Sequence, residues 1–199
     1  MNIKYSKNRI EFEKELNALD KFVIDFTFIL NKLNIKYVIV SGYVSILFGR
    51  SRTSEDIDLI VEKLNFDKFR KLWENVYKKF ECIIEKNSEH AYKEYLLTGH
   101  AIRFSKKDKF IPNIEMKFPK IDLDFWVLEE RREVLLNNYK LFISPLELQI
   151  PFKLFLGSEK DIEDARHLYS IFKDKLDLEL LQEFNRKLKI EKLFNKYLK

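Results

Sequence analysis

The sequence predicts an α/β protein whose sheet-forming core is followed by a helical C-terminal part. Apolar side chains recur at helical spacing over residues 9–33, and short apolar runs at residues 37–40 and 57–61 have the length of buried strands. From residue 144 onward the pattern is helical. Helices that alternate with strands, followed by helices alone, indicate an α/β (α+β) fold with an appended helical part.

The length and composition favour a cytoplasmic protein that does not enter a membrane. The 199 residues are enough for one substantial core plus an appended part. The chain contains no run of 18 apolar residues, and its first residues lack the pattern of a signal peptide. Its single cysteine, Cys82, lies among apolar residues and is expected to be a core thiol.

The net charge of +5 is concentrated at the C-terminal end. Residues 185–199 contain one acid, Glu191, and the cations Arg186, Lys187, Lys189, Lys192, Lys196 and Lys199. A basic terminal helix of this kind can lie along a nucleic-acid backbone, or it can simply be a solvated helix face.

The elements before residue 144 are expected in the following order. One long helix over residues 9–33 leads into the strand at 37–40, a short helix over 43–48 and the strand at 57–61. Asn65 or Asp67 can cap the next helix, which is expected to continue through Lys79. The remaining elements are a strand over 80–84, a brief helix over 90–97, strands over 101–104, 114–118 and 120–127, a helix over 129–138 and a strand over 139–143.

The C-terminal part begins with helix-capping signals. Ser144 is expected at the N-cap with Pro145 at the first helical position, and Glu147 completes a capping box. Pro151 is expected to break or kink this helix early, and Ser158 is expected to cap the next one. Helices over 176–188 and 190–198 end the chain. We expect residues 1–143 and 144–199 to pack as one unit, with an active site in the cleft between them.

Two carboxylates, Asp56 and Asp58, stand at the start of the strand at residues 57–61. Side chains two residues apart on a strand share a face, about 6 to 7 Å apart. Ionised carboxylates on an apolar strand are costly unless a cation such as a divalent metal neutralises them. If that metal is magnesium, a substrate that carries phosphate groups is suggested, because protein-bound Mg²⁺ commonly binds substrate phosphates. The turn at Ser41 and Gly42 suits that partner, because a glycine lets backbone N–H groups approach a phosphate.

These residues together resemble the signature of the nucleotidyltransferase superfamily, which has the fold of DNA polymerase beta. Ser41 and Gly42 match the small-residue turn, Asp56 and Asp58 match the metal-binding pair, and the loop between them is matched by Gly49, Arg52 and Ser54. The resemblance implies a mixed sheet flanked by helices, an NTP substrate and Mg²⁺ or Mn²⁺ as cofactor. It also implies that Ser41, Gly42, Arg52 and Ser54 take part in binding the nucleotide. The sequence departs from the signature at Ser41, whose Cβ can crowd a triphosphate.

The same superfamily carries a third carboxylate on a later strand, and three residues satisfy its context. Asp122 is the first choice because Lys120 precedes it by two places, Glu115 is a close rival, and Asp124 is the reserve. A third carboxylate is needed because two aspartates cannot fully ligate both a metal that activates the attacking hydroxyl and one that holds the triphosphate. Metal ligation is therefore expected of Asp56, Asp58 and Asp122, with Glu115 as the alternative.

The C-terminal part narrows the resemblance to AbiEii-type, abortive-infection nucleotidyltransferases. The matching residues are Lys153, Lys160, Asp161 and Asp164. Lys153 or Lys160, together with Arg52, can offset the charge of a triphosphate. An ordinary capped helix with ion pairs three and four residues apart would give the same pattern.

We expect a metal-dependent nucleotidyltransferase that transfers NMP from NTP to an acceptor hydroxyl. The resemblance implies a toxin of a toxin–antitoxin or abortive-infection system, with a cognate antitoxin as partner and an RNA end or a protein as acceptor. The basic C-terminal end favours RNA.

Two alternatives stay open at this point. One is a catalytically silent, nucleotidyltransferase-like partner or antitoxin module. The other is a small-molecule adenylyltransferase of the antibiotic-modifying kind, whose acceptor pocket would need an acidic lining.

Overall fold

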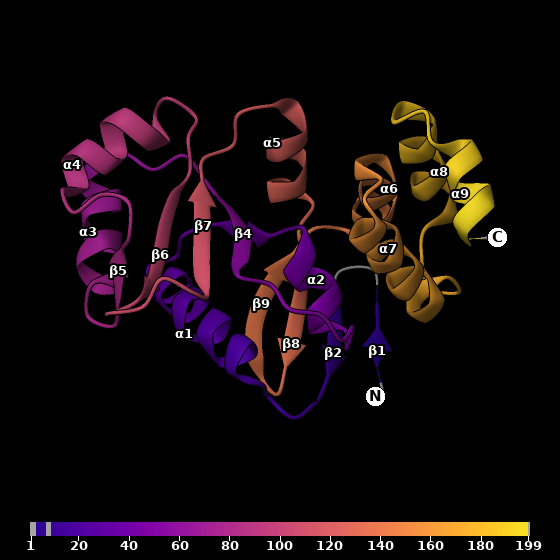
Figure 1. The fold of residues 1–199 in the computed structure, drawn as a ribbon, viewed down its shortest axis with the longest axis horizontal. Coiled ribbons are helices and arrows are strands. Elements are labelled where there is room, and N and C mark those ends of the chain that lie inside the picture. The colour runs from indigo at the N-terminus through magenta and orange to yellow at the C-terminus, as the bar shows by residue number, and fades with distance from the viewer. Residues whose placement is uncertain (1–2, 7–8, 199) are drawn as a thin grey trace.

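A nine-stranded mixed sheet forms the centre of the protein in the computed structural model, which describes residues 3–6 and 9–198 (Figure 1). The strands are β1 (Lys4–Tyr5), β2 (Arg9–Phe12), β3 (Tyr37–Ile39), β4 (Asp56–Val61), β5 (Phe80–Cys82), β6 (Ile102–Lys106), β7 (Asn113–Lys117), β8 (Arg132–Leu136) and β9 (Tyr139–Ile143). Their order across the sheet is β1-β2-β8-β9-β3-β4-β7-β6-β5. The pairs β2–β8, β3–β9 and β4–β7 are parallel, and the other pairs are antiparallel.

Helices cover both faces of this sheet. They are α1 (Ala18–Lys32), α2 (Gly42–Leu47), α3 (Phe66–Val76), α4 (Ser88–His90) with the following π-helical turn η1 (Ala91–Leu96), α5 (Asp122–Glu129), α6 (Leu146–Leu156), α7 (Glu159–Phe172), α8 (Leu178–Lys187) and α9 (Glu191–Leu198). Helices α6 to α9 lie together at one end of the molecule, and α3 and α4 lie at the other end (Figure 1).

The two faces of the sheet carry two separate apolar clusters. On one face, Phe26 of α1 and Phe69 of α3 belong to the same buried cluster as Ile57 of β4. On the other face, Val127 of α5 packs with Ile60 of β4 in a smaller cluster that also contains residues of α6 and α8. Because side chains alternate along a strand, the second face also carries Asp56 and Asp58. The small cluster therefore joins the sheet to the helical part beside the two carboxylates.

The predicted class, an α/β protein with a mixed sheet flanked by helices, is confirmed. The strands around Val38 and Leu59, the helix capped by Asn65 and the helix capped by Ser158 all lie where the pattern placed them. Cys82 is buried in β5, as expected of a core thiol. The division at residue 143 into a core and a helical part stays a prediction.

The long helix expected over residues 9–33 is wrong in its first third. Arg9–Phe12 is strand β2, which pairs in parallel with β8, and the helix begins only at Ala18. Ile10 and Phe12 point to the same side and are buried, which is a period of two rather than a helical period. Asn17 caps the helix by accepting a hydrogen bond from the backbone N–H of Asp20, 2.8 Å away.

The strand expected over residues 120–127 is helix α5. Asp124 decides this, because its carboxylate accepts hydrogen bonds from the backbone N–H groups of Lys120 (2.9 Å) and Ile121 (3.3 Å). Carboxylates in the first turn of a helix satisfy its unpaired N–H groups and oppose its dipole favourably. The alternation of Asp122 and Asp124 was thus a helix-start signal.

The helix expected over residues 129–138 is wrong as well, because Arg132–Leu136 is strand β8. It forms a hairpin with β9 through Asn137 and Asn138, both of which have positive φ (48° and 67°). Two central residues with positive φ characterise the tight hairpin turns that match the twist of the strands, and asparagine adopts this conformation more readily than most residues.

The first C-terminal helix begins differently from the expectation. Helix α6 starts at Leu146, and Ser144 makes no capping bond but donates from Oγ to Gln149 Oε1 at 2.8 Å. Glu147 is fully buried and binds Arg132 rather than completing a capping box. Pro151 lies inside the helix, which continues to Leu156. Among the described residues, no helix has both the length and the apolar character that crossing a membrane requires.

Candidate active site

Three carboxylates lie on one face of two neighbouring strands. Asp56 and Asp58 are two residues apart on β4, and Glu115 on the parallel strand β7 is the registered partner of Asp58. Registered partners of a strand pair point to the same side of the sheet, and so do residues two apart. The fold therefore presents Asp56, Asp58 and Glu115 together, half-buried, on the face that α5 covers in part.

The electrostatics of Asp58 reflect this crowding. Burial raises its pKa above the ordinary value, and the negative charges of Asp56 and Glu115 raise it further. A hydrogen bond from Ser41 and the positive charge of Lys153 oppose that shift. Asp58 thus has two carboxylates and one ammonium group as electrostatic neighbours, and a bound cation would favour its charged form.

The donor set fits a hard divalent cation by chemistry, because all three groups supply carboxylate oxygens. The part of the chain that the structure describes nevertheless contains no group of three His, Cys, Asp or Glu side chains arranged closely enough to hold a metal ion. Glu115 faces the neighbouring strand β6 instead, where its Oε2 lies 2.5 Å from Nη2 of Arg103. Arg103 is half-exposed, so this ion pair lies at the surface.

The turn after β3 brings a glycine against an arginine. Gly42 begins α2, and a Cβ built on it would lie only 3.1 Å from Nη2 of Arg52. The preceding residue, Ser41, has φ 63° and ψ −137°, a conformation that side chains with a Cβ rarely adopt. A side chain at position 42 would therefore crowd the Arg52 guanidinium, and Ser41 holds a strained backbone beside Asp58.

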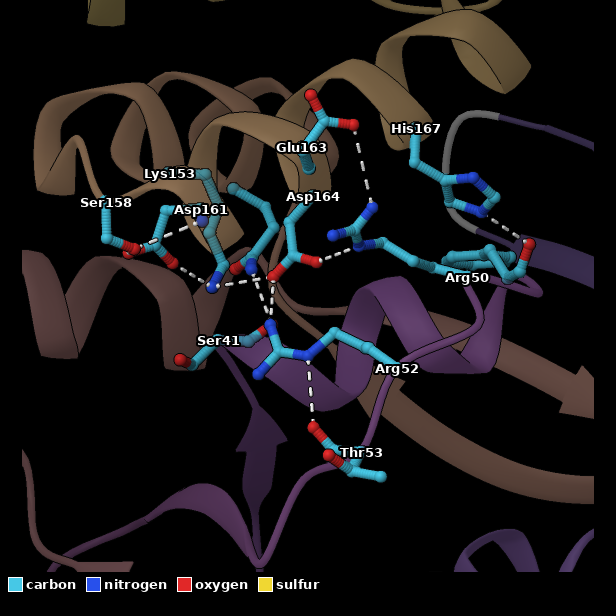
Figure 2. Close-up of polar contacts among 12 residues, drawn as sticks. Ser41, Arg50, Arg52, Thr53, Lys153, Ser158, Asp161, Glu163, Asp164 and His167 are labelled. Atoms are coloured by element: carbon cyan, nitrogen blue, oxygen red, sulfur yellow. Dashed lines mark hydrogen bonds and ion pairs between the residues drawn. The ribbon is translucent and has the colours of Figure 1, made fainter.

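A buried carboxylate gathers three cations from two parts of the chain (Figure 2). Asp164 on α7 is fully buried, and it lies 2.7 Å from Nε of Arg50, 2.5 Å from Nη1 of Arg52 and 3.0 Å from Nζ of Lys153. Arg50 and Arg52 belong to the loop between α2 and β4, whereas Lys153 belongs to α6. Asp164 therefore ties the loop of the predicted signature to the helical part.

A second carboxylate, Asp161, completes the environment of Lys153. Nζ of Lys153 lies 2.6 Å from Oδ1 of Asp161, and Ser158 donates from Oγ to the other oxygen at 2.6 Å (Figure 2). Burial raises the pKa of Asp161, but the hydrogen bonds from Lys153 and Ser158 outweigh it and leave the pKa below its ordinary value. Lys153 is held by two acids, and its side chain is 3% exposed.

A small cavity of about 130 Å³ lies between the sheet, α5 and α6. Ser41 and Lys153 line it on the side of the carboxylates. Its walls are mostly apolar, with Leu123 and Val127 from α5 and Leu148, Phe152 and Leu156 from α6. Its remaining charged residues are Lys117 and Asp124, which pair with each other at 3.2 Å.

The structure separates the predicted site residues into two groups. Asp56, Asp58, Glu115, Ser41, Gly42, Arg52 and Lys153 lie around one region. Asp122, the first choice for the third carboxylate, is exposed in the first turn of α5, so the strand that was to carry it beside Asp58 is wrong. Asp124, the reserve, is occupied in capping that helix and in binding Lys117.

The two remaining predicted nucleotide-binding residues are Ser54 and Lys160. Ser54 is half-buried and donates from Oγ to the backbone oxygen of Asp56 at 2.9 Å, so it shapes the start of β4. Lys160 is exposed on α7, and the ion pairs found among the described residues do not include it. Their roles in nucleotide binding stay predictions.

Sequence reasoning missed Arg50 and Arg103. Arg50 shares Asp164 with Arg52, and its position two residues before Arg52 in a loop of the signature was an available signal. Arg103 lies in the strand expected over residues 101–104, but its pairing with Glu115 depends on the neighbouring position of β6 and β7, which no local pattern reveals.

Comparison with solved structures finds proteins that are similar to this chain. An antigenic nucleotidyltransferase-like protein from Paracoccidioides brasiliensis is similar to this chain, with a TM-score of 0.51 and 19% identity over 92% of this chain and 94% of the other. ANT(2'')-Ia, solved with adenylyl-2''-tobramycin, matches with a TM-score of 0.49 and 13% identity over 86% and 99% of the two chains. JHP933 from Helicobacter pylori matches with a TM-score of 0.47 and 16% identity over 91% and 78%.

Sequence comparison adds no relative. No family model matches the chain, and no curated protein sequence matches it. The fold is therefore assigned from the similarity to the Paracoccidioides brasiliensis protein, together with the strand order and helix placement described above. The chain has the α/β fold of nucleotidyltransferase-like proteins, with a mixed sheet flanked by helices.

Proposed function

We propose that this protein transfers a nucleoside monophosphate from an NTP to an acceptor hydroxyl and releases pyrophosphate. The observation that carries the proposal is the placement of Asp56, Asp58 and Glu115 on one face of β4 and β7, beside Lys153 and the turn at Ser41 and Gly42. Acidic and basic groups placed side by side in this way suit a metal-bound triphosphate, which carries both kinds of charge.

Asp56, Asp58 and Glu115 would hold Mg²⁺ or Mn²⁺, with Glu115 in place of Asp122 as the third ligand. When bound, the metal supplies positive charge to the phosphates and to the attacking hydroxyl. Glu115 must turn from Arg103 to take part, and both side chains are exposed enough to move. The charged form of Asp58, which burial disfavours, suits a site that a cation completes.

Arg52 and Lys153 would bind the triphosphate. Both are already oriented, because Asp164 accepts a hydrogen bond from Arg52 and forms an ion pair with Lys153, and Asp161 accepts a hydrogen bond from Lys153. Orienting charged groups before the substrate arrives reduces the reorganisation that binding and transfer require. Asp164 and Asp161 are thus positioning residues in this proposal.

The cavity beside Ser41 favours an acceptor that is not a polycation. Its walls are apolar, its cations are Lys117 and Lys153, and its acid Asp124 is paired with Lys117. A polyamine-like antibiotic would need unpaired carboxylates there. An RNA end suits the lining better, because the flat faces of its base can pack on apolar side chains and its phosphates are anionic. We therefore take RNA rather than a protein side chain as the first acceptor to test.

The test is transfer of label from each α-³²P-labelled NTP to total RNA and to co-purified protein, with Mg²⁺ or Mn²⁺. Asp58→Asn should abolish transfer and leave the fold intact, because burial already disfavours the charged carboxylate. Glu115→Gln should abolish it too, whereas Asp122→Asn should retain it. If Asp122→Asn lost transfer activity and Glu115→Gln retained it, the assignment of Glu115 as the third carboxylate would be overturned.

A protein that transfers no label to RNA or protein with either metal would instead be the catalytically silent partner that the sequence also allows. A toxin of an AbiEii-like pair predicts in addition that expression of the wild-type chain stops bacterial growth. Expression of Asp58→Asn at the same level should then permit growth, and arrest by both chains would separate toxicity from transfer.

A further inference from the structure

A hollow of about 740 Å³ lies at the end of β3 and β4 that is remote from Ser41 and Asp56. Its walls come from the C-terminal half of α1, the residues that lead into β3, the end of β4 and the β8–β9 hairpin. We call it the end groove. From Lys36, which lines it, to Ser41 the chain runs five residues in largely extended form, about 17 Å, so the end groove is separate from the carboxylates.

Two exposed aromatic rings stand in the end groove. Phe28 of α1 is 62% exposed, and Tyr139 at the start of β9 is 46% exposed. Neither ring is covered by the apolar clusters of the core among the described residues. Rings left in water at the wall of a groove are costly, and a flat partner stacked on them would remove that cost.

Arg131 also lines the end groove, and its guanidinium forms no ion pair among the described residues. Its guanidinium lies over the ring of Phe142, 4.5 Å from the centroid, and Nη1 donates to the backbone oxygen of Leu128 at 3.0 Å. Its Nε is buried and has no hydrogen-bond partner among the described residues, and no ion pair found there includes it. Burial lowers the pKa of Arg131. An anion in the groove would relieve this desolvated charge.

The remaining charges of the end groove are mostly positive. Lys36, Lys68 and Lys140 line it with Arg131, against one acid, Glu62. Lys68 pairs with Glu62 at 2.8 Å, and Lys140 pairs at 3.1 Å with Glu133, which lies outside the groove. Lys36 also pairs with an outside acid, Glu129. These lysines are partly exposed, and surface pairs of this kind are weak enough to exchange for phosphate.

We propose that the end groove binds single-stranded nucleic acid, with bases stacked on Phe28 and Tyr139 and a phosphate on Arg131. Exposed rings interleaved with cations are the physical requirement for binding unpaired bases and their backbone. A duplex offers no splayed bases to such rings, because its bases are stacked on each other. The proposal extends the RNA-acceptor form of the proposed function by giving the acceptor a docking surface remote from the reacting groups.

The experiment measures binding without transfer, so its failure differs from failure of the proposed function. The full chain is titrated against a fluorescein-labelled 12-nucleotide single-stranded RNA of mixed sequence, without NTP and without divalent metal, and anisotropy is followed at several salt concentrations. Phe28→Ala and Tyr139→Ala should each weaken binding about tenfold, and both changes lie at exposed positions where the fold tolerates them.

Phe110→Ala is the matched control, because Phe110 is 75% exposed and does not line the groove. It should bind with unchanged affinity. Arg131→Gln should weaken binding and make the slope of log K against log salt shallower by about 0.7, the value for one phosphate contact on a single strand. A blunt-ended RNA duplex of 12 base pairs, which has no unpaired bases, should bind at least tenfold more weakly than the single strand.

Three outcomes would overturn the proposal. One is unchanged affinity in Phe28→Ala and Tyr139→Ala. Another is equal affinity for the duplex and the single strand. The third concerns the double variant Lys192→Glu, Lys196→Glu in the basic C-terminal end. The proposal would be overturned if this variant lost RNA binding while the end-groove variants bound RNA normally.

Discussion

Removing the charge of Asp164 should destabilise the protein strongly. Its carboxylate is fully buried and has three cations within 3.0 Å, namely Arg50, Arg52 and Lys153. Asp164→Asn keeps the shape of the side chain and one oxygen acceptor but leaves these cations with fewer negative charges. Lys153 keeps Asp161, whereas Arg50 and Arg52 lose their closest carboxylate.

The magnitude follows from the exposure of the three cations. Removal of one partner from a buried ion pair costs about 3 to 5 kcal/mol. The side chains of Arg50 and Arg52 are 20% and 18% exposed, so water can replace part of what they lose, and the lower end applies. We expect the free energy of unfolding to fall by about 3 kcal/mol. For a chain of this length that is a fall in Tm of about 6 to 12 °C.

Urea unfolding followed by circular dichroism measures this change. Asp174→Asn is the control, since Asp174 is an exposed aspartate in the turn that follows the same helix and should change stability by less than about 0.5 kcal/mol. In a double-mutant cycle, Asp164→Asn and Arg52→Gln should be non-additive by about 1 kcal/mol or more. A loss below 1 kcal/mol for Asp164→Asn, or full additivity, would refute the reasoning that Asp164 holds the loop cations in place.

Three further predictions concern the turn after β3 and the N-terminal strand. Ser41→Gly should raise the free energy of unfolding by about 1 kcal/mol in urea titrations, because glycine adopts φ 63° and ψ −137° without strain; a loss of stability would show that the hydroxyl matters more than the backbone. Gly42→Ala should raise the KM for NTP in the transfer assay, because its Cβ would lie 3.1 Å from Nη2 of Arg52 and crowd the guanidinium. An unchanged KM would contradict a dependence of triphosphate binding on the exact position of Arg52. Burial, and then the charge of Glu147, raise the pKa of Tyr5 from 10.0 to about 12, so its contribution to stability should be complete below pH 10 and lost as pH rises through about 12. The stability difference between wild type and Tyr5→Phe, measured in urea at pH 8, 10 and 11.5, should therefore shrink only above pH 10, and a difference independent of pH would contradict this.

The strong local signals of the sequence predicted the elements that position the site. The strand into Ser41, the strand that starts at Asp56 and the caps at Asn65 and Ser158 are all specified by adjacent residues. Short apolar or alternating runs were ambiguous. Apolar and polar residues alternate over 120–127 as they do in a strand. A helix forms instead, and the Asp124 carboxylate stabilises its start by accepting hydrogen bonds from two backbone N–H groups.

The identity of the third carboxylate could not be derived locally. Glu115 and Asp122 have similar neighbours in the sequence, and only the pairing of β7 with β4 places Glu115 opposite Asp58. The same holds for Glu147, whose partner Arg132 is 15 positions away and on another element. Contacts between distant segments depend on the whole sheet order, which periodicity does not encode.

The alternation of β7 has a consequence for how this chain can vary. Ile114 and Met116 point into the main apolar cluster, and Glu115 between them points to the opposite face. A single inserted or deleted residue in this five-residue segment would exchange the two faces, driving an acid into a dry interior and turning the aliphatic pair toward solvent. Natural insertions and deletions are therefore expected in the loops on either side of β7. They would change the number of residues between Asp58 and Glu115 but would leave the two as registered partners on neighbouring strands.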